Sequence, residues 1–191
     1  ARLGRALLEL GGNNAIIISQ HADLDISILG ALFGAVGTAG QRCTTTRRLI
    51  VQEQVYEEVK NQLVAAYAQL NIGDPLNEKN HVGPLIDTDA VEQYLHSIEA
   101  CKKEGGKFIV EGGVLSGRGY ESGCYVKPCI AEVQPGFNIV KHETFAPILY
   151  LIKYTHLEEA IAIQNSVPQG LSSSIMTLHL REAELFLSAA G

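Results

Sequence analysis

The chain has 191 residues, of which 46% are hydrophobic, and its 15 basic and 21 acidic residues leave a net charge of −6. This composition suits one α/β domain, or one domain with a fragment of another, and is too apolar for a disordered chain. No basic run suggests nucleic-acid binding, and the apolar stretches are too short or too interrupted to cross a bilayer. We therefore expect neither nucleic acid nor a membrane as a partner.

The first elements are a short apolar run, a glycine-rich break, a strand and a helix. Residues 6–10 (ALLEL) resemble a strand, and residues 15–19 (AIIIS) are rich in β-branched side chains, as in a buried parallel strand. Asp23 is a suitable N-cap for a helix running to about Gly37. Because this helix is apolar nearly all round, we expect it to be buried.

The rest of the chain continues to alternate strands with helices. The predicted strands and extended segments are 47–52, 107–111, 125–133, 148–154 and 171–176; the predicted helices are 53–70, 88–104, 157–165 and a last one from about 181; the predicted loops and turns are 71–86, 112–123 and 142–147. This order predicts an α/β fold with a largely parallel sheet flanked by helices. A first strand without visible partners and an abrupt last helix lead us to expect a piece of a longer protein.

The four cysteines, at positions 43, 101, 124 and 129, are irregularly spaced. The core is large enough without disulfides, and neither a CxxC pair nor a second cluster supports a zinc site. We predict four free thiols in a reducing compartment and no bound metal.

Cys43 differs from the other cysteines in its neighbours, since it lies in GTAGQRCTTT among small and polar residues. A lone cysteine is usually a small buried apolar residue. Here Gly37 and Gly40 would let the backbone approach a ligand, and exposed N–H groups of the turn could stabilise an oxyanion. Cys43 is therefore a candidate nucleophile, with Arg42 as a possible activating neighbour.

Two carboxylates are further candidates. Glu9 lies in the apolar run LLELGG, where burial would raise its pKa towards that of a general base, although it could also be a surface-facing strand residue. Glu143 lies in the turn KHETFAP, where it could bind a sugar hydroxyl beside Phe145, or simply be solvated.

Three motifs taken together resemble the NAD(P)-dependent aldehyde dehydrogenase family. They are ELGGNNA at 9–15, FGAVGTAGQRCTT at 33–45 and HETFAP at 142–147, and IGDPL and VGPLI match a loop of the same family. The 34-residue gap from Glu9 to Cys43 fits the family pattern. Most of the family has a lysine where this chain has Asn13, and the ELGGNNA form is similar to the branch that oxidises α-aminoadipic semialdehyde in lysine catabolism.

The resemblance implies a role for each matching residue. Cys43 would attack the aldehyde to give a thiohemiacetal and then a thioester, and Glu9 would activate the water that hydrolyses it. Glu143, Phe145, Leu10 and Gly11 would contact the nicotinamide half of NAD, with NADP also possible. Arg42 would bind the distal carboxylate of the substrate, because a guanidinium binds a carboxylate bidentately.

The resemblance also implies a domain division. Residues 1–11 would be the tail of a cofactor-binding domain, and residues 12–191 most of a catalytic domain; no GxGxxG loop is present. We expect a homo-oligomer, dimeric or tetrameric, in the cytoplasm or mitochondrion, and no full turnover by this segment alone. The alternatives are an aldehyde dehydrogenase for betaine aldehyde or simple aliphatic aldehydes, a non-catalytic fragment, and a cysteine hydrolase.

Overall fold

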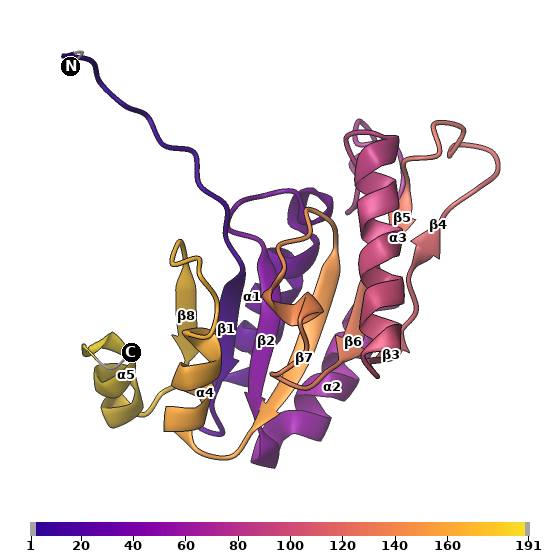
Figure 1. Cartoon of the computed structure of the whole chain (residues 1–191). Helices are drawn as coiled ribbons and strands as arrows, with labels where there is room; N and C mark the ends of the chain where they lie inside the picture. The colour runs from indigo at the N-terminus through magenta and orange to yellow at the C-terminus, as the bar shows by residue number, and fades with distance from the viewer. Residues whose placement is uncertain (1–2, 190–191) are drawn as a thin grey trace.

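A computed structural model describes residues 3–189, and most of them form one sheet with helices on both faces (Figure 1). The strands are β1 (Asn14–Ile18), β2 (Thr46–Gln52), β3 (Lys107–Val110), β4 (Gly113–Val114), β5 (Val126–Lys127), β6 (Cys129–Glu132), β7 (Ile148–Tyr154) and β8 (Ser173–Met176). The main sheet has the order β3-β6-β7-β2-β1-β8, and every neighbouring pair except β3–β6 is parallel. The predicted α/β fold with a largely parallel sheet is confirmed.

The helices are α1 (Leu24–Val36), α2 (Glu53–Tyr67), α3 (Thr88–Lys103), α4 (Leu157–Gln164) and α5 (Leu180–Leu187), with 3₁₀ turns η1 (Gly37–Gly40) and η2 (Ile139–Lys141). The connection from β1 through α1 to β2 moves across the sheet in one direction, and that from β7 through α4 to β8 moves in the other. Because parallel crossovers are right-handed, α1 and α4 must cover opposite faces, as Figure 1 shows.

The centre of the core lies on β1, β2 and β7. All five residues of β1 are buried, as are six of the seven in each of β2 and β7. Their continuous β-branched and leucine runs suit strands that are covered on both faces. This burial makes the three strands a rigid support for the loops that precede them.

Two expectations about the first part of the chain were wrong. Residues 6–10 form no strand: they are exposed and extend away from the sheet (Figure 1), where no described strand can pair with them. Helix α1 is capped by Asp23 as predicted, through a 3.2 Å bond from the Ile26 N–H, but is buried on one face only. Ile26, Leu29 and Phe33 are exposed on its other face.

The remaining elements match their predicted positions closely. The expected exposed loop at 112–123 contains β4, which pairs with β5 in a small antiparallel ribbon, and β3 is antiparallel in the main sheet. None of the helices within residues 3–189 combines the length and hydropathy needed to cross a membrane. Residues 1, 2, 190 and 191 of the two predicted domains lie outside the described range.

Candidate active site

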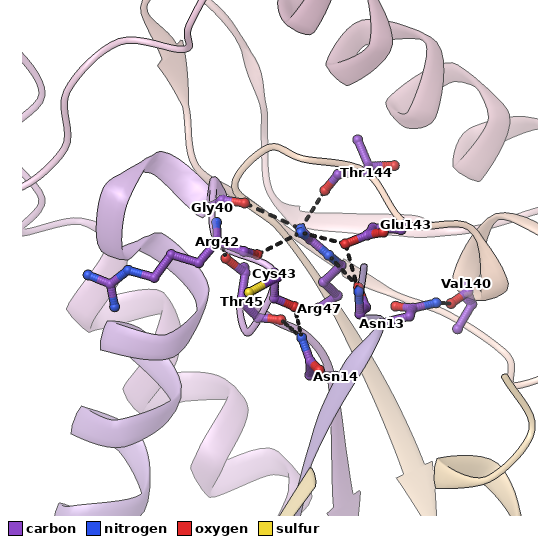
Figure 2. A network of polar contacts seen from close by, with 11 residues as sticks. Asn13, Asn14, Gly40, Arg42, Cys43, Thr45, Arg47, Val140, Glu143 and Thr144 are labelled. Carbon is purple, nitrogen blue, oxygen red and sulfur yellow. Dashed lines mark hydrogen bonds and ion pairs between the residues drawn. The ribbon is translucent and has the colours of Figure 1, made fainter. Parts of the chain in front are cut away.

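Three loops meet at the amino ends of three neighbouring strands. Gly12 lies just before β1, Cys43 just before β2, and Glu143 a few residues before β7. Since β7, β2 and β1 are adjacent and parallel, their amino ends lie at the same edge of the sheet. The fold therefore brings together the three segments that the sequence motifs single out, although they are up to 131 residues apart (Figure 2).

Cys43 lies half-buried in a tight turn whose carbonyl groups are held by hydrogen bonds. The Asn14 side-chain amide donates to the Cys43 carbonyl at 2.7 Å and to the Thr45 carbonyl at 2.9 Å. The Thr45 N–H closes the turn on the Arg42 carbonyl at 3.1 Å. Within residues 3–189 the Cys43 N–H has no hydrogen-bond partner, so it can donate to an incoming oxygen.

The segment before this turn has an unusual backbone. Thr38, Ala39 and Gly40 all have positive φ, at 53°, 54° and 71°. Residues other than glycine rarely adopt this conformation, because their Cβ clashes with the backbone. A Cβ at Gly40 would lie 2.4 Å from the carbonyl carbon of Ala146. Gly40 thus permits close contact between the thiol loop and the ETFAP turn. From the sequence we expected this glycine to let the backbone approach a ligand instead.

Gly11 and Gly12 are needed for packing between loops. A Cβ at Gly12 would lie 2.4 Å from the Cys43 carbonyl oxygen, and a Cβ at Gly11 would lie 2.2 Å from a Glu143 carboxylate oxygen. The contact with the Cys43 backbone cannot be relieved by a side-chain rotation. The two glycines therefore set the distance between the Glu9 segment, the thiol loop and the Glu143 turn.

Glu143 is held by a backbone donor and a buried cation. Its Oε1 accepts the Gly12 N–H at 2.9 Å and lies 3.6 Å from a guanidinium nitrogen of Arg47. The Glu143 side chain keeps 20% of its surface exposed, whereas Arg47 keeps 2%. Arg47 also stacks on Phe145, 5.0 Å from the ring centroid, and Phe145 remains 41% exposed.

Arg42 is exposed, and its side chain extends away from the Cys43 sulfur (Figure 2). Its guanidinium lies 5.2 Å from the centroid of the Phe33 ring, in a cation–π contact. Arg42 and Phe33 line a largely apolar cavity of about 700 Å³ between α1 and α2, with His81 at its edge. Arg42 is thus available to a ligand that reaches the thiol from this side.

Glu9 and Leu10 do not contact Cys43 in this structure. Both are exposed in the extended segment before β1, so of the two alternatives for Glu9 this structure has the exposed one. The segment has no neighbouring strand among the described residues that could cover it. Glu9 is nevertheless three residues from Gly12, a length that spans at most about 10 Å, so it remains within reach of the thiol loop.

No sequence motif singles out Arg47 or Asn14 as a site residue. Arg47 and Arg48 are both buried at the start of β2, and the arginine pair in the otherwise apolar run RRLIVQ could have indicated this. Burial lowers the pKa of Arg48 to about 10. Burial also lowers the pKa of Arg47, and the negative charge of Glu143 partly offsets this decrease. The described residues contain no cluster of side chains suited to hold a metal ion.

A largely parallel sheet presents a half-buried thiol and an ion-paired carboxylate at the same edge, an arrangement that can support nucleophilic chemistry. The model of the aldehyde dehydrogenase family matches residues 1–190, and the chain belongs to this family. Aldehyde dehydrogenase family 7 member A1 of Pisum sativum is 52% identical over 176 residues, and the alpha-aminoadipic semialdehyde dehydrogenase of Bos taurus is 49% identical over 177. Each alignment covers 92% of this chain, which spans about a third of the relatives' length (34% and 32%).

Solved structures of the family have the same fold. Betaine aldehyde dehydrogenase from Staphylococcus aureus, in complex with NAD+, is 26% identical with a TM-score of 0.89, over 93% of this chain and 36% of its own. HpcC from Thermus thermophilus is 30% identical with a TM-score of 0.88, over 93% of this chain and 35% of its own.

Proposed function

We propose that this chain forms the thiol-bearing part of an NAD(P)-dependent aldehyde dehydrogenase that converts α-aminoadipic semialdehyde to α-aminoadipate. The observation that carries the proposal is the meeting of the Cys43 turn, with its free N–H, and the Glu143 carboxylate at one edge of the sheet. Support comes from the bovine relative, which is named for this substrate. Residues 1–11 would be the tail of a cofactor-binding domain, and residues 12–191 most of the catalytic domain, in a longer enzyme that assembles as a homo-oligomer.

The residues around Glu143 fit the nicotinamide end of the cofactor. Oε1 is engaged by Gly12, and Oε2 accepts no hydrogen bond from any described residue, so it can accept from a ribose hydroxyl. The exposed face of Phe145 can pack beside the same sugar, since its other face lies against Arg47. Gly11 and Leu10 follow Glu9 along the same edge. When bound, the nicotinamide supplies the hydride acceptor.

Cys43 then performs nucleophilic addition. Its thiolate forms a bond to the aldehyde carbon, and the negative charge that develops on the aldehyde oxygen is stabilised by the Cys43 N–H. Loss of hydride from this carbon leaves a thioester on the sulfur. The hydrogen bonds from Asn14 keep the turn in place throughout, because they hold the carbonyl groups on both sides of Thr44.

Glu9 is proposed as the base for the second half of the reaction. It takes a proton from water, whose oxygen attacks the thioester carbon, and the carbon–sulfur bond breaks to release the carboxylate and the Cys43 thiolate. In this role the Glu9 segment would fold back towards the thiol turn while Gly11 and Gly12 keep their packed positions. A partly desolvated position there would raise the basicity of the carboxylate.

Arg42 is proposed to select an aldehyde with a distal carboxylate. Replacing Arg42 by Met in the full-length enzyme should lower kcat/KM for α-aminoadipic semialdehyde by about 10- to 100-fold, the usual contribution of a charged hydrogen bond. The rate on hexanal, which lacks the carboxylate, should change by less than about twofold, since the lost interaction is absent there.

The Arg42→Lys variant is the matched control and should retain part of the preference, because it keeps the charge but not the bidentate geometry. NADH absorbance gives all the rates. An equal loss on both aldehydes, or a wild-type preference for betaine aldehyde, would contradict the assignment of substrate.

A further inference from the structure

We propose that Arg47 is a positioning residue for the cofactor: it holds Glu143 so that one carboxylate oxygen stays directed at the nicotinamide ribose. The inference rests on the proposed function, because it concerns how Glu143 would bind that sugar. Neither the sequence motifs nor the names of the relatives assign a role to this residue.

Arg47 joins all three loops of the site through backbone carbonyls. Its Nε donates to Gly12 at 3.3 Å, and its two terminal nitrogens donate to Gly40 at 3.4 Å, to Arg42 at 3.2 Å and to Thr144. These acceptors come from the segments before β1, before β2 and before β7. One buried side chain therefore fixes the relative position of the thiol turn and the Glu143 turn (Figure 2).

The same guanidinium determines which oxygen of Glu143 is free. Oε1 faces both the Gly12 N–H and Arg47, whereas Oε2 lies over Gly11 without a hydrogen-bond donor among the described residues. The stacking of Arg47 on Phe145 fixes the ring two residues further along the same turn. Without the cation, a single neutral N–H would hold a carboxylate side chain that is one-fifth exposed.

Arg48 provides an internal comparison, since it is equally buried and adjacent in sequence. Its three hydrogen bonds go to the carbonyls of Asn13, Ile163 and Gln164, and no carboxylate of the described residues forms an ion pair with it. Arg48 therefore supports the fold on the other side of β2 without touching Glu143. Comparing variants of the two arginines therefore distinguishes a contribution to fold stability from a contribution to the position of Glu143.

The test is a double-mutant cycle in the full-length enzyme, with NADH binding followed by fluorescence and the KM for NAD measured beside it. Arg47→Met and Glu143→Gln should each weaken NADH binding by about tenfold, the scale of a charged hydrogen bond. If Arg47 acts through Glu143, the double variant should bind NADH with the same affinity as Glu143→Gln alone, to within about twofold. Arg47→Lys, which keeps the charge, should recover part of the loss.

Arg48→Met is the control, and it should lower the melting temperature without weakening NADH binding once the protein is folded. Additive losses in the cycle, an unchanged affinity in Arg47→Met, or an equal loss in Arg48→Met would each overturn the inference. If Arg47→Met does not fold, Arg47→Lys combined with Glu143→Gln gives the same comparison. A wild-type enzyme that binds no NADH would contradict the proposed function instead, so the two failures are distinguishable.

Discussion

At the residue scale, the surroundings of Cys43 differ from those of the two buried thiols, Cys101 and Cys129. Cys101 and Cys129 are fully buried among apolar side chains, and burial raises their pKa to about 11 and about 12. Such thiols behave as small apolar residues. Cys43 is half-buried in a polar turn whose geometry is set by Asn14. The neighbours of Cys43 in the sequence indicated this difference correctly, but the Asn14 side chain that binds its carbonyl group comes from another strand.

We predict that iodoacetamide at pH 8 labels Cys43 while Cys101 and Cys129 stay unmodified. The raised pKa values keep both buried thiols protonated at pH 8, where their thiolate fraction is about 100-fold or more below that of an ordinary thiol. The measurement is peptide mass spectrometry of folded and urea-unfolded protein, in which the unfolded sample should label at all three positions. Rapid labelling of Cys129 in the folded protein would contradict this account of the thiols.

At the element scale, the site is built from strand amino ends and close contacts between loops. Each motif leads into a predicted strand, so the sequence indicated where the loops attach. It could not indicate that β7, β2 and β1 are neighbours, because strand order depends on long-range pairing. The burial of α1 was overestimated for a related reason, since composition counts the apolar residues of a helix without showing which faces are covered.

The contact between loops predicts a strong effect of Gly12→Ala. The new Cβ would lie 2.4 Å from the Cys43 carbonyl oxygen, so the thiol turn or the start of β1 must move. We expect a loss of about 1–3 kcal/mol in the free energy of unfolding, as for other overpacked sites, and a large loss of turnover. Gly136→Ala is the matched control, since no described residue lies within 4 Å of its Cβ. Urea unfolding and NADH production measure the two effects, and equal behaviour of the two variants would exclude the proposed packing role.

At the scale of the whole molecule, the six-stranded sheet supports a site at one of its edges. The motifs and their order were sufficient to predict the family and the α/β class, because both depend on local pattern and spacing. The antiparallel β3, the exposed segment at 6–10 and the Arg47 network were not predictable in this way, since each depends on contacts between distant parts of the chain. The chain spans about a third of its relatives (34% of the pea protein), so activity is a property to test in the full-length enzyme.

The central claim is that Cys43 carries the substrate as a thioester. The most direct measurement mixes the full-length enzyme with NAD and α-aminoadipic semialdehyde, quenches in acid within milliseconds and locates the acyl group by peptide mass spectrometry. We predict an aminoadipoyl mass on the peptide that contains Cys43, formed together with NADH and absent in Cys43→Ala. NADH formation with no adduct on that peptide, or undiminished turnover by Cys43→Ala, would contradict the account.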